Sequence, residues 1–177
     1  TELLGITKYE PPIPAGMEGI ARAPFPTHLV SKTDETRVQV LQEELKKYKG
    51  VECYITEKVD GTSATYIWHD GEFMICSRNQ VLEENGDTFY HDIEKRLGIK
   101  EKLCRLGRNL AIQGEIIGPK IQSNKYKLNE NHFKVFNIYD TAEQRYLNLE
   151  EFIGLCKTLG LETVDVLDEH YTLTDDI

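Results

Sequence analysis

The residues best suited to covalent chemistry are Lys58-Val59-Asp60-Gly61, which lie between two segments rich in strand-forming residues. A lysine amine becomes a nucleophile once it loses its proton, and nearby positive charge or loss of water favours the neutral amine. A carboxylate two residues later can help to hold a divalent cation, which supplies such charge. The alternative is a β-hairpin with a solvent-facing lysine, because Asp-Gly is a favoured two-residue hairpin turn.

The elements that must position this stretch are predicted to be strands. Apolar and polar residues alternate on both sides of it, and Asp-Gly pairs at 60–61 and 70–71 separate the segments. We therefore expect a three-stranded antiparallel meander over residues 51–77. Its strands cover residues 51–58, 62–69 and 72–77.

An amphipathic helix is predicted over residues 34–48, just before the first strand. Thr33 or Asp34 can cap it, because a short side-chain oxygen accepts from the free N–H groups of the first turn. Gly50 can end it, since glycine readily adopts the left-handed conformation found after helices. The apolar face of this helix repeats at helical spacing and comprises Val38, Leu41, Leu45 and Tyr48.

The rest of the chain alternates helices and strands. One or two short helices are predicted within 88–107, and Asn148 is predicted to cap a helix over 149–159, with Glu151 completing a capping box and Gly160 ending it. Further strands are predicted at residues 109–118, 132–140 and 161–168. These elements predict an α+β fold, mainly antiparallel sheet flanked by a few helices.

Length and composition are those of one domain with a proper core, with 177 residues of which 40% are hydrophobic. The net charge of −9 argues against broad, nonspecific adhesion to nucleic acid, but it leaves room for a local basic groove. Five of the six prolines lie in residues 1–26, which predicts a linker or an extended arm, with ordered coil packed on the domain as the alternative. The domain itself is expected over 27–177.

The cysteines and the hydropathy pattern suggest an intracellular protein. The chain has no pattern typical of a signal peptide and no apolar run long enough to span a bilayer. The four cysteines are far apart without a Cys-x-x-Cys pair, which predicts reduced core residues rather than zinc ligands: Cys53, Cys76, Cys104 and Cys156.

Four stretches occur in the order of the motifs of covalent nucleotidyltransferases, the class of polynucleotide ligases and capping enzymes. Lys58-x-Asp-Gly resembles motif I, and residues 77–79 (SRN) resemble motif Ia. Residues 113–122 (QGEIIGPKIQ) resemble the Gly-Glu-x-x-Gly-x-x-Ile-Gln segment of RNA ligases, and residues 133–140 (FKVFNIYD) resemble motif III. The chain thus resembles this superfamily over some 80 residues, in a fold of antiparallel sheets flanked by helices, an ATP-grasp-like ligase domain.

Finer features resemble the fifth RNA ligase family, the Naegleria and Deinococcus type. After the glycine of motif I this chain has Thr62-Ser63, whereas DNA ligases more often carry an arginine at the second of these positions. Residues 25–39 also resemble the stretch ahead of motif I in that family. The resemblance implies an N-terminal OB-fold domain ahead of residues 1–26. It also implies later motifs IV (Glu-Gly-x-Val) and V (Lys-x-Lys), and neither occurs after residue 140. We therefore expect a nucleotidyltransferase domain truncated before motifs IV and V, with weak or no self-adenylylation.

The resemblance implies an ATP-dependent RNA ligase that joins a 3′-hydroxyl to a 5′-phosphate, sealing nicks for RNA repair. Lys58 would carry AMP as lysyl-AMP, and Asp60 and Glu115 would hold Mg²⁺ or Mn²⁺, mainly through water, or the ribose of AMP. Nucleotide-binding residues implied in the same way are Glu57, Lys58, Arg37, Gln39, Arg78, Glu115 and Phe136. The implied partner is RNA or an RNA-containing nicked duplex, bound by a monomer that has no contact with membranes.

Several of these residues also have ordinary structural interpretations. A strand phenylalanine such as Phe136 is usually a core residue, and helix surfaces often carry residues such as Arg37 and Gln39. Lys120, Lys125 and Lys127 form either a local basic patch or a solvated loop.

Three other functions are compatible with the sequence. A DNA ligase or a GTP-dependent capping guanylyltransferase would use the same lysine with another substrate. A binding module with a chance hairpin lysine would form no covalent nucleotide.

Overall fold

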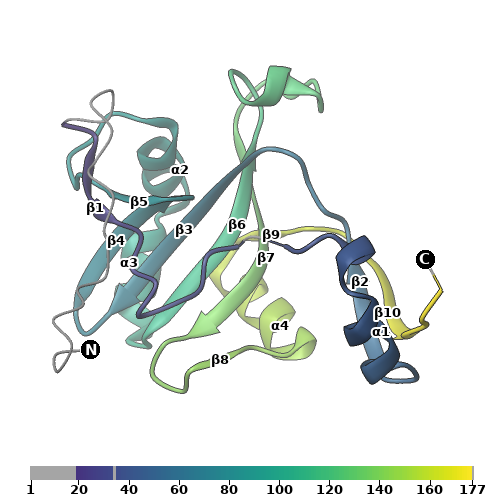
Figure 1. The fold of residues 1–177 in the computed structure, drawn as a ribbon. Coiled ribbons are helices and arrows are strands. Elements are labelled where there is room, and N and C mark those ends of the chain that lie inside the picture. The colour runs from purple at the N-terminus through teal and green to yellow at the C-terminus, as the bar shows by residue number, and fades with distance from the viewer. Residues whose placement is uncertain (1–18, 34, 177) are drawn as a thin grey trace, which may run out of the picture.

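Two β-sheets of different size organise residues 19–33 and 35–176, the part of the chain that the computed structural model describes (Figure 1). The main sheet contains β1 (Ala21–Pro24), β3 (Thr62–His69), β4 (Glu72–Ser77), β5 (Gln80–Leu82), β6 (Leu110–Ile117), β7 (His132–Asp140), β8 (Arg145–Tyr146) and β9 (Glu162–Thr163). Its strand order is β1-β5-β4-β3-β6-β7-β8, and β9 runs parallel to β7. The second sheet pairs β2 (Glu52–Thr56) with β10 (Val166–Thr172).

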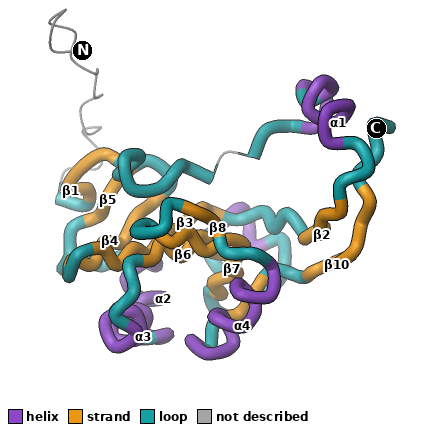
Figure 2. The backbone as a smooth tube through the Cα atoms, turned by 90° about the horizontal axis from the view of Figure 1, so that it is seen from below, coloured by secondary structure: helices purple, strands orange, loops and turns teal. Residues whose placement is uncertain are grey.

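Helices cover one face of the main sheet. The helices of the described residues are α1 (Gln42–Tyr48), α2 (Phe89–Leu97), α3 (Ile99–Leu106) and α4 (Leu149–Leu159), with 3-10 turns at Val38–Val40 and Gln122–Asn124. Figure 2 shows α2, α3 and α4 on one side of the sheet and the segment between β1 and α1 on the other. Between helices and sheet, Tyr66, Ile112 and Phe133 form a buried core with Leu103 and Phe152. The predicted α+β class is therefore confirmed.

Several local predictions are confirmed. β3 and β4 form a hairpin, and Asp70 (φ 47°) and Gly71 (φ 85°) form its left-handed turn. The side chain of Asn148 accepts from the N–H of Glu151, whose side chain accepts in return, so the capping box of α4 is complete. Gly160 ends α4 in the left-handed conformation (φ 60°).

The predicted three-stranded meander is wrong, because β2 does not pair with β3. It pairs with β10 in the second sheet, and its residues are only exposed or half-buried. No buried face of β2 therefore holds it against the core. The Asp60-Gly61 turn is also wrong, since neither residue has positive φ among those described. Residues 57–61 instead carry the chain from one sheet to the other.

The predicted helix over 34–48 is shortened to α1, and its N-terminal cap differs. Thr33 does not cap a helix, because its hydroxyl shares a hydrogen bond of 2.9 Å with the hydroxyl of Ser63. Asp34 lies outside the described residues. The predicted apolar face is not buried, since α1 lies beside the second sheet (Figure 1), away from the core, and buries no residue. Gly50 follows α1 with φ 84°, as predicted.

The two ends of the described chain also depart from the simple predictions. The strand predicted over 161–168 is split, because β9 joins the main sheet and β10 joins the second. Near the N-terminus, β1 pairs with β5 at the edge of the main sheet and ends at Pro24, a position where a missing N–H is tolerated. Residues 1–18 of the predicted arm lie outside the described residues.

The cysteines are unpaired, but only Cys76 and Cys156 are buried, whereas Cys53 is half-buried and Cys104 is exposed. The prediction of core cysteines therefore holds for two of the four. Within the described residues, the helices are all too short or too polar to cross a membrane.

Candidate nucleotidyl-transfer site

Lys58 lies exposed in the loop between β2 and β3, and Gly61 fixes the end of that loop against β6. The N–H of Gly61 donates to Oε1 of Glu115 over 3.1 Å. A Cβ at position 61 would lie 2.2 Å from the carbonyl oxygen of Ile116, a separation that real Cβ atoms essentially never show. Only glycine permits this approach, so the motif glycine is needed for backbone proximity rather than for a hairpin turn.

Glu115 is the electrostatic centre of the site. Burial raises the pKa of its carboxyl group, and the charge of Asp60 raises it further. The Gly61 N–H and the positive charges of Lys58 and Arg78 act in the opposite direction and lower that pKa. Residues that were predicted from three separate motifs therefore meet at Glu115, whose carboxyl group feels the charges of Lys58, Asp60 and Arg78.

The β6–β7 loop closes over Asp60. The backbone N–H of Asp60 donates to the Tyr126 hydroxyl over 2.9 Å, and the Lys125 ammonium group contacts the Asp60 carboxylate. This contact raises the pKa of Lys125. Sequence reasoning missed Tyr126, since it belongs to none of the motif-like stretches. It included Lys125 only as a member of a basic loop.

The two carboxylates fit a divalent cation that is held largely through its own waters. The ammonium group of Lys125 contacts the Asp60 carboxylate, and the charge of Lys58 acts on the Glu115 carboxylate. Both carboxylates therefore lie near positive charge. Within residues 19–33 and 35–176, no group of three or more His, Cys, Asp or Glu residues is placed to bind a metal directly. Magnesium usually keeps several waters and takes only one or two carboxylates, which matches this pair.

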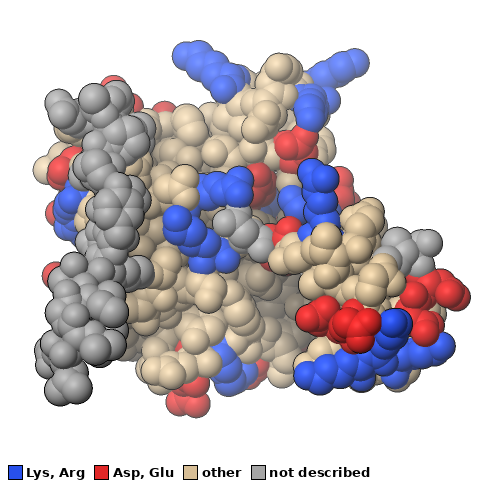
Figure 3. All heavy atoms as spheres, viewed as in Figure 1, with Lys and Arg blue, Asp and Glu red and all other residues tan. Residues whose placement is uncertain are grey.

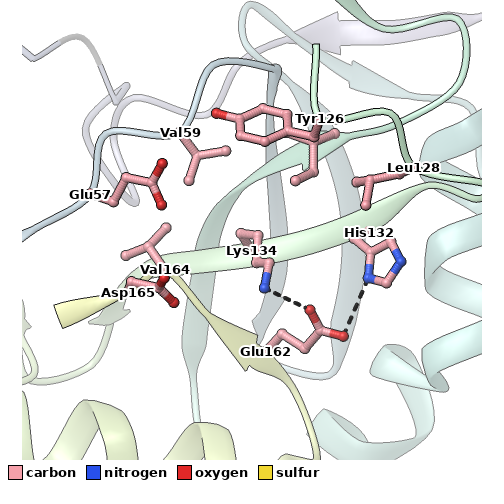
Figure 4. A pocket seen from close by; sticks show the side chains of 10 residues that line it. Glu57, Val59, Tyr126, Leu128, His132, Lys134, Glu162, Val164 and Asp165 are labelled. Atoms are coloured by element: carbon pink, nitrogen blue, oxygen red, sulfur yellow. Dashed lines mark hydrogen bonds and ion pairs between the residues drawn. The ribbon is translucent and has the colours of Figure 1, made fainter. Parts of the chain in front are cut away.

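A cavity of about 290 Å³ opens beside the loop that carries Lys58 (Figure 4). It is lined by Glu57, Val59, Ile117, Tyr126, Leu128, His132, Lys134, Glu162, Val164 and Asp165. Lys134 points across it to Glu162, with an ion pair of 2.9 Å, and His132 lies 3.3 Å from the same carboxylate. Both neighbours of Lys58 in the chain line this cavity.

Phe136 borders the same region from β7. The pairing of β6 with β7 is interrupted here, because Gln113 faces Asn137 whereas Gly114 faces Val135. Phe136 is the extra residue of this β-bulge, a feature that often redirects a side chain. Half-buried, it packs against the apolar cluster of Val59, Ile117 and Val164, but it does not line the cavity.

The remaining predicted residues lie apart from this centre. Arg37 and Gln39 are exposed around the 3-10 turn Val38–Val40, and within the described residues no hydrogen bond or ion pair joins either one to Lys58 or Glu115. Lys120 and Lys127 are exposed in the β6–β7 loop, where Figure 3 shows basic side chains at the top of the view. Glu57 is tied instead to Asp165, whose carbonyl accepts its N–H over 2.9 Å.

The fold, with a lysine-bearing loop between two mainly antiparallel sheets, is that of a nucleotidyltransferase domain. A family model described as RNA ligase matches residues 51–176, and the chain belongs to this RNA ligase family. A comparison with curated proteins gives no match.

Solved structures of Naegleria gruberi RNA ligase are similar over almost the whole chain. An aspartate-to-alanine variant in the apo state has a TM-score of 0.83 and 39% identity, covering 97% of this chain and 52% of that chain. A lysine-to-alanine variant with ATP and Mn has a TM-score of 0.82 and 39% identity, covering 98% and 52%. The structure with pyrophosphate has a TM-score of 0.82 and 40% identity, covering 97% and 52%. This chain spans about half the length of these relatives.

Proposed function

We propose that this chain is the nucleotide-transfer part of an ATP-dependent RNA ligase, which seals a 3′-hydroxyl to a 5′-phosphate. The observation that carries this proposal is the position of exposed Lys58 near Glu115, whose pKa its charge lowers. Gly61 fixes the loop that carries Lys58, because its N–H donates to Glu115 and its backbone lies close against β6. Membership of the RNA ligase family and the likeness to an enzyme solved with ATP and Mn support it.

Three covalent steps follow from a nucleophilic lysine. Nζ of Lys58 attacks the α-phosphorus of ATP, forming a phosphoramidate bond and releasing pyrophosphate. An oxygen of the RNA 5′-phosphate then attacks the same phosphorus, which releases Lys58 and leaves AMP on the RNA end. The 3′-hydroxyl finally attacks the 5′-phosphate, forms the phosphodiester bond and releases AMP. Covalent catalysis thus divides one difficult transfer into easier ones.

The carboxylates prepare the first of these steps. Asp60 and Glu115 would hold Mg²⁺ or Mn²⁺ through its waters, and such a cation supplies positive charge that favours the neutral lysine and offsets charge on the α-phosphate. Arg78 adds a further positive charge near Glu115, whose pKa it lowers. These residues orient the nucleophile and the phosphate that it attacks.

The adenine base would lie on the β7 side of Lys58. Phe136 offers a half-buried aromatic face there, and aromatic faces bind bases with little sequence preference. Glu57 and Val59 border the neighbouring cavity, where Glu57 can reach the base or the ribose. We retain Arg37 and Gln39 as weaker candidates for contact with ATP.

The substrate would be RNA or a nicked duplex that contains RNA, sealed by a monomer. An OB-fold domain would precede residues 1–26, which would lead into the nucleotidyltransferase domain over 27–177. Within that leading segment, β1 and Phe25 already pack on the main sheet. These assignments rest on the likeness to the Naegleria enzyme, of whose chain the match covers 52%.

The decisive experiment measures the intact mass of the full-length protein after incubation with ATP and Mg²⁺ or Mn²⁺. We expect a gain of one AMP, lost in Lys58→Ala. Lys95→Ala is the matched control, because Lys95 is an exposed lysine on α2, on the opposite face of the sheet. For residues 1–177 alone, we expect weak adduct formation or none.

The same assay separates the alternatives. An adduct with GTP but not ATP would indicate a capping guanylyltransferase, and preferential sealing of DNA nicks over RNA nicks would indicate a DNA ligase. No adduct with either nucleotide in a folded full-length protein would leave a binding module and overturn the proposal.

A further inference from the structure

Residues 25–33, which we call the strap, cross the face of the main sheet opposite the helices (Figure 2). Phe25 and Val30 of the strap are buried against Ile67, Cys76 and Ala111 of the sheet. Each of these two anchors is at least nine-tenths buried, at 5% and 2% exposure. Their burial holds the strap on the sheet at a defined position.

Two polar contacts fix the C-terminal part of the strap. Gln113, 0% exposed on β6, donates from Nε2 to the carbonyl of Ser31 over 2.9 Å. Two residues further, the hydroxyl of Thr33 shares a 2.9 Å hydrogen bond with Ser63 of β3. Because Ser63 is paired with Glu115 in the sheet register, the strap ends next to the candidate site.

The strap also holds the turn that carries Arg78. At one end, the N–H of Phe25 donates to the carbonyl of Asn79 over 2.8 Å. Near the other end, Nζ of Lys32 donates to Oδ1 of Asn79 over 2.9 Å. Exposed Lys32 is therefore fixed beside Asn79, the residue that follows Arg78, although Lys32 and Arg78 are far apart in the sequence.

Lys32 retains capacity for an anion. An ammonium group has three donors, and the contact with Asn79 uses one of them. Within residues 19–33 and 35–176, no carboxylate lies within ion-pair distance of Lys32, in contrast to Lys125, which is paired with Asp60. Figure 3 shows basic side chains on this face of the molecule.

The strand order predicts which part of a nucleotide would reach Lys32. Phe136 and the cavity lie at β7, Glu115 lies on β6, and the Ser77–Asn79 turn lies between β4 and β5, beyond β3. A nucleotide with its base at β7 and its α-phosphate at Lys58 therefore directs the group beyond that phosphate toward β3 and β4. That group is a further phosphate in every step before sealing.

We propose that Lys32, fixed by Asn79, binds the phosphate that lies next to the α-phosphate, and so acts as a specificity-determining contact. This inference rests on the proposed function. The shared chemistry is a phosphate group, which has two sources: the β- and γ-phosphates of ATP in the first step, or the 5′-phosphate of the RNA strand in the second. Thr33 and Gln113 act only through Lys32, as positioning residues.

The test compares Lys32→Ala, Lys32→Arg and Lys157→Ala in the full-length protein, in two separate arms. One arm measures KM and kcat for ATP in lysyl-AMP formation. The other uses protein already carrying AMP and measures KM and kcat for a nicked RNA duplex with a 5′-phosphate. Lys157 is a matched exposed lysine on α4, across the sheet from the strap.

We expect Lys32→Ala to raise KM roughly tenfold in at least one arm, with kcat changed less, as for loss of one charge-assisted hydrogen bond. The arm that responds identifies the source of the phosphate. Lys32→Arg should recover most of the loss. If the RNA arm is the one that responds, Lys32→Ala should also reduce the slope of log KM against log salt there by about 1. Lys157→Ala should match the wild type.

Changes below twofold for Lys32→Ala in both arms, in a protein that forms lysyl-AMP and seals RNA, would overturn this inference and leave the proposed function intact. A wild-type protein that forms no lysyl-AMP at all would instead refute the proposed function. An equal loss in Lys32→Ala and Lys157→Ala would also overturn the inference, since it would show a general effect of surface charge.

Discussion

Glu115 gives the site a dependence of stability on pH that can be measured without substrate. Its pKa is raised above the ordinary 4.5, first because burial disfavours the charged form. A raised carboxyl pKa means that the folded state binds the proton more tightly, so the ionised group destabilises the fold only once pH rises through that pKa. We expect Glu115→Gln, which keeps an acceptor for the Gly61 N–H, to raise Tm by roughly 1–2 °C at about pH 7.5.

The difference should close toward about pH 4, where the wild-type carboxyl is also neutral. Thermal unfolding of both proteins at the two pH values tests this, and a variant less stable than the wild type at pH about 7.5 would contradict it. The same variant should lose lysyl-AMP formation, which would separate the chemical role of Glu115 from its effect on the fold.

Position 61 is where an added side chain would most directly displace Lys58. A Cβ would lie 2.2 Å from the Ile116 carbonyl oxygen and 2.7 Å from Cγ2 of Ile117, so the loop must move in Gly61→Ala. We expect a loss of about 1–3 kcal/mol in the free energy of unfolding and loss of the AMP adduct. Denaturant unfolding and intact mass measure the two effects. Gly154→Ala is the control, since a Cβ there meets nothing within 4 Å on α4 and should be neutral or slightly stabilising.

At the residue scale, motif order identified Lys58, Asp60, Arg78 and Glu115, and the structure brings these four together. The reason given for Gly61 was wrong, because close backbone approach leaves no pattern in a single sequence. The contacts of Tyr126 and Lys32 were not predictable either. They join positions 66 and 47 residues apart, and such pairs depend on the tertiary fold.

At the scale of elements, α4 is the best test of local sequence rules. Its complete capping box satisfies free N–H groups of the first turn, and Asn148→Ala should cost about 1 kcal/mol, or roughly 2–4 °C in Tm. Asn148→Asp, which retains an accepting oxygen, should remain close to the wild type. Thermal unfolding measures both variants, and equal losses in the two would show that the cap does not stabilise α4.

Acid should weaken the same capping box. Arg145 and the Asn148 N–H lower the pKa of Glu151 from 4.5 to about 2. A lowered carboxyl pKa gives stability that is present above about pH 4.5 and lost as pH falls toward about 2.

Elements with a complete local signal were predicted well, and those that depend on distant partners were not. The β3–β4 hairpin and α4 each carry their turn or cap residues within the segment. β2 has equally strong strand character, but its partner β10 is more than 100 residues away, and the adjacent Asp-Gly pair suggested a hairpin instead. The helix over 34–48 was overextended because its apolar spacing was taken as evidence of burial, and α1 buries no residue.

For the molecule as a whole, the net charge of −9 disfavours broad contact with nucleic acid. Basic side chains nevertheless project from the β6–β7 loop and from the face that the strap crosses (Figure 3). Recognition of RNA by such a chain would rest on a few basic side chains at defined positions rather than on an overall positive charge. This distribution is consistent with contacts such as that proposed for Lys32.

The two sheets should differ in stability within the 177-residue chain. Central strands β3 and β6 are paired on both sides and carry fully buried residues such as Tyr66 and Ile112. In contrast, β2 and β10 pair only with each other among the described residues, and neither they nor α1 contain a buried residue. Local opening requires little loss of buried contact there, so their amides should exchange at least about tenfold faster than those of β3 and β6.

Native-state hydrogen exchange followed by mass spectrometry measures this directly. Peptides that cover β2 and β10 should exchange together, because each strand loses its ladder when the other leaves. Uniform protection across both sheets would contradict the prediction and would show that the loop of residues 57–61, fixed at Gly61, couples them into one cooperative unit. Lys58 lies on that loop, so the outcome also determines whether the candidate nucleophile is anchored on both sides or only at β6.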